Sequence, residues 1–335
     1  MGNVIGLLVG VFLSAFMLTG VMRRYAIAKN IFDIPNRRSS HMLATPRGGG
    51  AAIVVSFLTG VFFVWLSGKI EKNFVIAVTG SGMLVAGIGF WDDHRHIKHQ
   101  WRLSVHFVAA CWSLLWLGGT TPQALHGFFI HAGWLGIGVV VFFMVWLLNL
   151  FNFMDGIDGI AGSEALFVSI GGAFLSFSAG SRSQALVLSI LAAATLGFLI
   201  WNWPPAKIFM GDVGSGFLGM MLGVLSYAGT ADGSVCIWSW LILFSIFIVD
   251  ATVTLLRRML HGEIWYEAHC NHTYQRAAKK YSHLKVTVSV NFINTLWLFP
   301  CAWYAYSNPE WGIVLMIVAY TPLLILAFLM EPANK

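Results

Sequence analysis

The chain has 335 residues, of which 58% are hydrophobic and only 10% charged, and its mean hydropathy is +0.75. This composition excludes the two soluble domains that the length alone would suggest, and it predicts one all-α integral membrane domain over residues 1–335. Four cysteines without a CxxC pair exclude a disulfide framework and a zinc cluster as organising features. The net charge of +6 does not indicate nucleic-acid binding, because the charges sort by side of the membrane.

The apolar segments predict a polytopic bundle of about eleven transmembrane helices. We expect them at about 3–22, 50–67, 74–91, 103–119, 133–151, 162–179, 184–201, 214–230, 235–256, 286–305 and 311–330. The first has no basic region before it and no A-x-A site after it, so we expect it to be retained. The connections on one side carry seventeen Lys and Arg residues, and those on the other side carry three. This bias predicts a periplasmic N-terminus, a cytoplasmic C-terminus and an active site at the cytoplasmic face.

The first cytoplasmic connection, Phe32 to Gly50, carries His41 and Arg47 beside prolines and ends in three glycines. Such a loop suits a phosphate or an anionic lipid, and the glycines allow a ligand or a neighbouring helix to approach closely. A basic anchor at the lipid headgroups is the alternative interpretation.

The second cytoplasmic connection begins with the adjacent acids Asp92 and Asp93 and ends with Arg102. Two neighbouring carboxylates at the end of a span are costly unless a cation shares them. Three histidines lie between these residues, and their basic neighbours favour a solvated, phosphate-facing loop over a transition-metal site.

The third connection, Asn149 to Glu164, places two asparagines and two aspartates between long uncharged segments. Asn149, Asn152 and Asp155 are three residues apart, so they share one face of a helix. Gly156 and Gly159 then weaken the helix, and Asp158 between them can point back from a turn. Carboxylates at a membrane favour a functional interpretation, and oxygen ligands at a helix end suit a hard cation such as Mg2+. The alternative is a polar loop with incidental acids.

The fourth connection contains Phe209, Gly211 and Asp212 just before an apolar span. The backbone N–H groups at this helix N-terminus are predicted to cradle a phosphate. Phe209 is a candidate for stacking on a base, although a single aromatic residue is more often part of a core.

The fifth connection carries His269, His272 and Arg276. The last two are four residues apart and are expected to share a helix face. Their basic neighbours favour a contact with a diphosphate over a metal site.

At these residues the chain resembles the polyprenyl-phosphate N-acetylhexosamine-1-phosphate transferases of the glycosyltransferase family 4 type, integral membrane enzymes that start bacterial cell-envelope glycans. Many members carry a histidine pattern HxHH, whereas this chain has His269-Cys-Asn271-His272. Together with the HxxATPRGGG loop, this departure resembles the O-antigen-initiating branch more than the peptidoglycan-precursor translocase. The resemblance rests on four motifs in order: Asp92-Asp93, Asn152-x-x-Asp155-Gly-x-Asp158-Gly, Phe209-Met-Gly-Asp212-x-Gly-Ser and the histidine loop.

The resemblance implies transfer of sugar-1-phosphate from UDP-FucNAc, UDP-QuiNAc or UDP-GlcNAc to undecaprenyl phosphate in the bacterial inner membrane, with release of UMP. It implies Mg2+, or Mn2+ in its place, held by Asp212 and Asn152. It places the catalytic acids Asp92 and Asp93 at the prenyl phosphate, as base or positioning group, with Asp155 and Asp158 near the nucleotide and Phe209 beside uracil. The other candidate substrate-binding residues are Asn149, Gly211, His269, His272, Arg276, Arg47, His41 and Arg102.

Two other classes of protein fit parts of the pattern. A secondary transporter or lipid flippase would carry its charges near the membrane midplane, often in two repeated halves, whereas here the acids cluster at one face. A non-catalytic lipid-binding scaffold would not need so many acids with paired asparagines. The expected partners are the UDP-sugar, the polyprenyl phosphate and membrane lipid, with no nucleic acid, and a homodimer is an open alternative to a monomer.

Overall fold

The computed structural model describes residues 2–35, 40, 41, 43–95, 97–118, 133–262 and 272–330. Nearly all of the regular structure is helical, and two short strands, β1 (Phe32–Asp33) and β2 (Thr45–Pro46), pair antiparallel with Phe32 opposite Pro46. The α-helices are α1 (Gly2–Ala28), α2 (Gly50–Leu66), α3 (Lys72–His94), α4 (His99–Leu117), α5 (Gly133–Met154), α6 (Ile160–Ser178), α7 (Arg182–Asn202), α8 (Asp212–Ala231), α9 (Ile237–Leu243), α10 (Ser245–Leu260), α11 (Thr273–Tyr281), α12 (His283–Ile293), α13 (Phe299–Ser307) and α14 (Gly312–Leu329).

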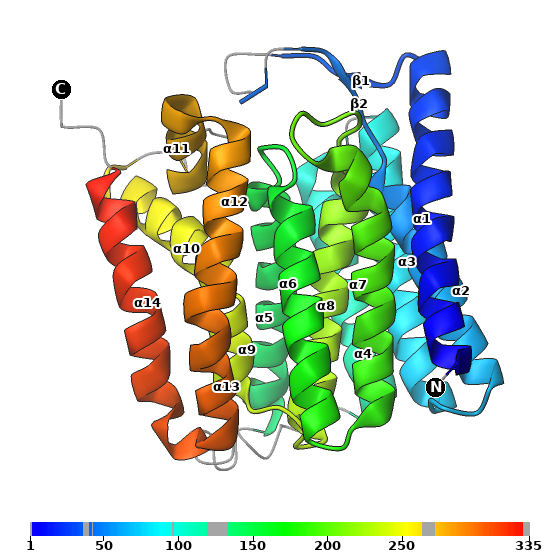
Figure 1. The fold of residues 1–335 in the computed structure, drawn as a ribbon, viewed down its shortest axis with the longest axis vertical. Helices are drawn as coiled ribbons and strands as arrows, with labels where there is room; N and C mark the ends of the chain where they lie inside the picture. Colours follow the sequence, from blue (N-terminus) through cyan, green and yellow to red (C-terminus); the bar gives the residue numbers. More distant parts are fainter. Residues whose placement is uncertain are drawn as a thin grey trace.

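The long helices run between two ends of one bundle, with β1, β2 and α11 at the end where α1 finishes (Figure 1). Helix α8 lies inside the bundle, and almost every one of its residues is buried. Its glycines allow this, because a Cβ at Gly219 would lie only 2.6 Å from the Cα of Leu148 on α5. Small residues permit close helix packing in membranes, where the hydrophobic effect supplies little attraction between helices.

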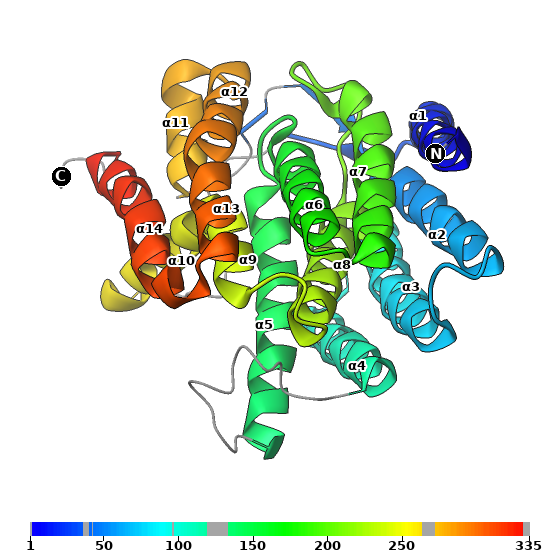
Figure 2. The ribbon, with the colours of Figure 1, turned by 60° about the horizontal axis from the view of Figure 1, so that its bottom comes forward.

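The predicted spans coincide with helices, and the structure is that of a multi-pass membrane protein. Among the described residues, eight helical segments are long and apolar enough to cross a membrane. The span predicted at 235–256 is not straight, since α9 and α10 meet at a bend of 73° beside Phe244. In Figure 2, α9 and α10 run in different directions beside α14. The total of eleven crossings and their sidedness stay predictions.

The span predicted at 286–305 is also irregular. Between α12 and α13 the backbone forms a π-helical turn, η2 (Asn294–Leu298). The side chain of Asn294 donates a hydrogen bond to Glu164 Oε2 on α6 at 2.7 Å, and both residues are fully buried. The π-helical turn therefore carries a polar contact into the apolar bundle.

Candidate active site

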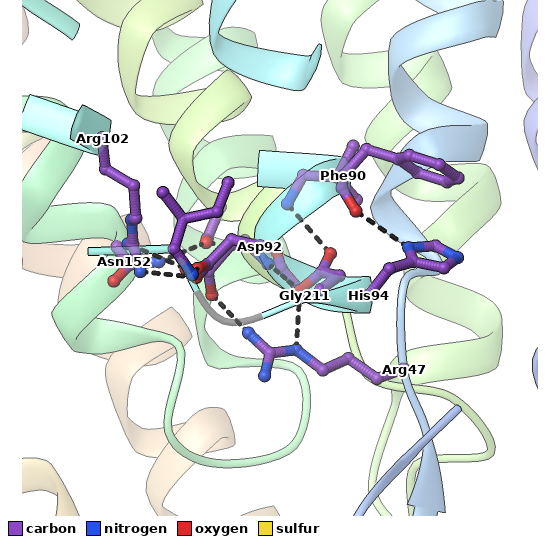
Figure 3. A network of polar contacts seen from close by, with 12 residues as sticks. Arg47, Phe90, Asp92, His94, Arg102, Asn152 and Gly211 are labelled. Carbon is purple, nitrogen blue, oxygen red and sulfur yellow. Dashed lines mark hydrogen bonds and ion pairs between the residues drawn. The ribbon is translucent and has the colours of Figure 1, made fainter. Parts of the chain in front are cut away.

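Two arginines and three aspartates from four separate segments meet at one end of the bundle. Asp92 and Asp93 end α3, Arg102 lies in the first turn of α4, Asp212 begins α8, and Arg47 precedes α2. Figure 3 shows Arg47 and Arg102 pointing at this group from opposite sides. The structure thus brings together residues up to 165 positions apart in the sequence.

The arginines bridge the carboxylates. Arg47 Nε lies 2.8 Å from Asp93 Oδ1, and its Nη2 contacts Asp212 Oδ1. Arg102 Nη1 lies 2.7 Å from Asp92 Oδ2, and its Nη2 lies 2.8 Å from Asp212 Oδ2. Burial by itself lowers the pKa of the Arg47 guanidinium, but the carboxylates of Asp212 and Asp93 raise that pKa above its ordinary value. Both oxygens of Asp212 are therefore held by cations.

Asp93 also caps the N-terminus of α8. Its Oδ1 accepts from the N–H of Asp212 at 2.9 Å, and its Oδ2 accepts from the N–H of Val213 at 3.2 Å. Gly211 makes this possible, because its φ of +76° and ψ of 170° suit glycine and a Cβ there would lie 2.5 Å from Asp93 Oδ2. A carboxylate at a helix N-terminus is stabilised by the helix dipole as well as by these bonds.

The prediction that the first N–H groups of α8 cradle a phosphate is wrong for this arrangement. Asp93 accepts two of them, and the carbonyl of Gly211 accepts those of Gly214 and Ser215 at 3.0 and 3.1 Å. The guanidiniums of Arg47 and Arg102 are instead the groups suited to bind an anion here.

Backbone contacts hold the Arg47 loop against the loop that precedes α8. Phe209 donates its N–H to the carbonyl of Pro46 at 2.8 Å and accepts from the N–H of Gly49 at 2.9 Å. Gly50 packs directly on α8, where a Cβ would lie 2.3 Å from the backbone. The glycine triplet therefore serves the close approach of a neighbouring helix, which is one of the two roles predicted for it.

His41 and Phe209 lie against each other at the same end of the bundle. Their ring centroids are 4.8 Å apart in an edge-to-face arrangement, and His41 Nε2 lies 3.7 Å from Asp33 Oδ1. Phe209 is half-buried. This placement is compatible with the stacking role predicted for Phe209, which stays a prediction.

The C-terminal end of α5 faces the same cluster. Asn152 donates to Ser215 Oγ on α8 at 3.1 Å and lies beside the Asp212 carboxylate. Burial raises the pKa of the Asp155 carboxyl well above its ordinary value, and the Arg47 guanidinium only partly opposes that rise. Asn149, one turn earlier, donates instead to the carbonyl of Val145 on its own helix.

Asp158 binds residues outside the cluster of arginines and aspartates. Its Oδ2 accepts from the N–H of Ala206 at 3.0 Å, and its Oδ1 lies 3.2 Å from His283 Nδ1. Its carbonyl accepts from Thr287 Oγ1 on α12 at 2.9 Å. Sequence reasoning did not single out His283, whose only signal was its position at the start of an apolar span. These bonds fix the loop between α5 and α6.

The histidine segment is only partly described, and His269 lies outside the described residues. His272 precedes α11, with its Nδ1 3.4 Å from Asp250 Oδ1, and the Asp250 carboxylate also accepts from the first two N–H groups of α11. The backbone N–H of Arg276 donates to the carbonyl of His272, which places the two residues one turn apart as predicted. Tyr274 then donates to the carbonyl of Phe153 at 3.0 Å, so α11 supports the end of α5.

The cluster has the chemistry of a magnesium site but not its closed geometry. Three carboxylates contact the two guanidiniums, with the Asp155 carboxyl nearby, and carboxylate and amide oxygens are the ligands that Mg2+ prefers. The arginines lie between the acids, and within the described residues no three His, Cys, Asp or Glu side chains are placed to hold a metal by themselves. Asp92, Asp93 and Asp212 outnumber the two arginines by one, so a bound cation would offset the remaining negative charge.

Known proteins are similar to this chain over the segment that carries these aspartates. A family model described as Glycosyl transferase family 4 matches residues 75–230, which contain all three aspartates of the cluster. A probable undecaprenyl-phosphate N-acetylglucosaminyl 1-phosphate transferase of Bacillus subtilis is 31% identical over 265 residues, covering 75% of this chain and 70% of the relative.

Two further groups of relatives are similar over long stretches. The decaprenyl-phosphate N-acetylglucosaminephosphotransferase of Mycobacterium tuberculosis is 26% identical over 332 residues, covering 88% of this chain and 81% of the relative. A phospho-N-acetylmuramoyl-pentapeptide-transferase of Streptococcus agalactiae is 29% identical over 228 residues, covering 64% and 66%. The chain belongs to glycosyl transferase family 4, among the polyprenyl-phosphate hexosamine-1-phosphate transferases.

Proposed function

We propose that the protein transfers N-acetylhexosamine-1-phosphate from a UDP-sugar to undecaprenyl phosphate and releases UMP. The observation that carries this proposal is the pair of guanidiniums, Arg47 and Arg102, that converge on Asp212 at one end of a membrane bundle. Such a pair binds the oxygens of a diphosphate, and its position at a bundle end lets a soluble nucleotide meet a membrane-bound phosphate. The names of the relatives, which act on polyprenyl phosphates, support the same reaction.

The residues of the cluster take distinct roles in this proposal. Arg47 and Arg102 exchange part of their contact with Asp212 for the diphosphate, and so place its β-phosphorus and offset its charge. Asp212 and Asn152 would hold Mg2+, with Mn2+ as the alternative, and this ion would neutralise charge on the diphosphate oxygens. Phosphoryl transfer depends mainly on such positioning and charge neutralisation.

Asp92 and Asp93 act as positioning groups rather than as the base. Both oxygens of Asp93 accept backbone N–H groups of α8, while Asp92 accepts from the N–H of Ile97 at 2.8 Å and binds Arg102. The polyprenyl phosphate is already an anion at neutral pH, so its oxygen attacks without losing a proton to the enzyme. We therefore propose direct attack, without a covalent enzyme intermediate.

The proposed donors are UDP-FucNAc, UDP-QuiNAc and UDP-GlcNAc, for the first step of O-antigen or a related envelope polysaccharide in the bacterial inner membrane. The GlcNAc-transferring relatives support an N-acetylhexosamine donor. The departure at Asn271 is the sequence feature that favours this branch over the second candidate, transfer of phospho-N-acetylmuramoyl-pentapeptide, which the streptococcal relatives support. A donor panel separates the two.

The test is UMP release by the purified protein with each UDP-sugar, undecaprenyl phosphate and Mg2+. We expect release that needs the lipid and stops with EDTA, and that falls at least 100-fold in Asp212→Asn, which keeps the size of the side chain but loses its charge. Asp232→Asn is the matched control, because Asp232 is exposed at the far end of α8 and should keep full activity. If the folded protein releases no UMP with any donor, the proposal is wrong and a lipid transporter or flippase becomes the favoured function.

A further inference from the structure

A groove lies on the bundle surface between α6, α7 and the segment formed by α12 and η2. It is separate from the arginine cluster, by which we mean Arg47 and Arg102 with the three aspartates that they contact. Figure 1 shows these helices side by side on one face of the bundle. The groove has a volume of about 580 Å3, within the range of about 300–1,000 Å3 typical of ligand sites. It is lined by Ser163, Leu166, Leu196, Leu199, Ile200, Trp203, Val288, Asn291, Phe292, Thr295 and Leu296.

The groove opens toward membrane lipid. Phe292 is 62% exposed and Leu296 66% exposed, on a helical segment that is apolar enough to cross a membrane. Ile200 on α7 is 48% exposed on the opposite wall. A hydrocarbon chain is therefore the occupant that its surroundings supply.

One polar group inside the groove has no partner in the protein. Ser163 lines the groove and is 2% exposed, and its Oγ makes no hydrogen bond to any described residue. A buried hydroxyl without a partner is unfavourable, so an acceptor atom on a bound ligand would relieve that cost.

A positive charge follows the groove toward the end that carries the motif loops. Lys285 is exposed and lies three residues before Val288 and seven before Phe292, so it shares their face of α12. A long lysine side chain reaches from an apolar wall to a headgroup phosphate. The positive charge of Lys285 and the apolar walls of the groove are thus complementary to a phospholipid, whose phosphate would lie at the mouth of the groove and whose acyl chain would lie inside it.

Protein contacts separate this groove from the arginine cluster. The bonds of Asp158 to Ala206 and Thr287 join the α5–α6 loop to the elements on either side of the groove, next to Trp203 and Val288. Gly159 fills the remaining space, since a Cβ there would lie 3.2 Å from Pro204 Cδ and 3.5 Å from Thr287 Cγ2. A lipid in the groove is therefore distinct from the lipid phosphate that reaches Arg47 and Arg102.

We propose that this groove binds an acyl chain of a membrane glycerophospholipid, with an ester carbonyl accepting from Ser163 Oγ and the phosphate contacting Lys285. A polyprenyl chain lacks any acceptor atom near Ser163, which is why the structure favours the acyl ester. The bound lipid would stabilise the packing of α6 against α12, and thereby the position of the loop that contains Asp158. The binding itself does not depend on the transferase reaction.

The test measures how many phosphatidylglycerol molecules the delipidated protein retains, by native mass spectrometry, and the rise of its melting temperature when that lipid is added. Leu196→Trp should fill the groove and abolish one tightly held lipid with its thermal shift. Ile170→Trp is the control, because Ile170 is 55% exposed on α6 and does not line the groove. Ser163→Ala, which removes only the hydroxyl, should weaken binding about two- to tenfold.

Two results would overturn the proposal. One is equal lipid retention and equal thermal shifts in Leu196→Trp and Ile170→Trp, with both variants melting like the wild type before lipid is added. The other is displacement of the phosphatidylglycerol by undecaprenyl phosphate in the groove, which would assign the groove to the acceptor. Both readouts are independent of UMP release, so the two proposals fail separately.

Discussion

Gly211→Ala should damage the cluster without touching a charged side chain. Gly211 has a φ of +76° and a ψ of 170°, a backbone conformation that is essentially restricted to glycine. A methyl group there would lie 2.5 Å from Asp93 Oδ2, so the Asp93 carboxylate must move away from the N-terminus of α8. The backbone strain costs about 1–3 kcal/mol and the lost cap about 0.5–2 kcal/mol.

The expected loss of stability is therefore about 1.5–5 kcal/mol if the backbone keeps its conformation. Arg47 binds Asp93 and Asp212 together, so the same displacement misplaces the guanidinium. A misplacement of about 1 Å at a reacting centre can lower the rate about 100-fold. The melting temperature in detergent and kcat/KM for UMP release should both fall.

Gly87→Ala is the matched control for that experiment. Gly87 lies on α3, the helix that ends with Asp92 and Asp93, and a Cβ there meets no atom within 4 Å. Alanine should leave activity unchanged and alter stability by at most about 1 kcal/mol, in the stabilising direction. If Gly211→Ala behaved like Gly87→Ala in both assays, the proposed link between the α8 cap and the cluster would be refuted.

Three further variants test separate contacts. Arg102→Lys should lower kcat/KM about tenfold or more with little change in melting temperature, because one ammonium cannot reproduce the fork between Asp92 and Asp212. Asp250→Asn should lower the melting temperature by a few degrees, since it weakens the carboxylate cap of α11, and unchanged melting would contradict that role. The pKa of Asp155 is raised in the folded state, so the unfolded state loses this proton first and the wild type loses stability as pH rises above about 4. In EDTA, the melting temperature of Asp155→Asn should therefore rise relative to that of the wild type between pH 5 and pH 8. A difference in melting temperature that does not change with pH would refute this.

The helices were predictable because their signal is composition. A run of apolar residues fixes a span whatever it packs against, so the ends of the predicted ranges and of the observed helices agree within six residues, the largest difference being at Ala28, where α1 ends. The bend beside Phe244 was not predictable, since the apolar run continues through it from α9 into α10. What turns the chain there is packing between helices, which one sequence does not display.

The polar residues of the site were predictable as a set but not in their contacts. Carboxylates and arginines at one face of a membrane stand out by cost alone, and Asp92, Asp93 and Asp212 do meet Arg47 and Arg102. The direction of each side chain depends on distant partners.

Asp158 illustrates this limit. It stands in the same motif as Asp155, yet it binds His283, 125 residues later, because the α5–α6 loop packs against α12. The sequence spacing within the motif carries no information about that contact.

The most direct measurement of the proposed reaction follows two labelled phosphates of the donor. The UDP-sugar is labelled with 32P at either its α- or its β-phosphorus, and the label is counted in the organic phase after incubation with undecaprenyl phosphate and Mg2+. Attack on the β-phosphorus moves the β-label into the lipid and leaves the α-label in water as UMP. An α-label in the lipid, or neither label there while UMP or UDP is released, would contradict the transfer of sugar-1-phosphate.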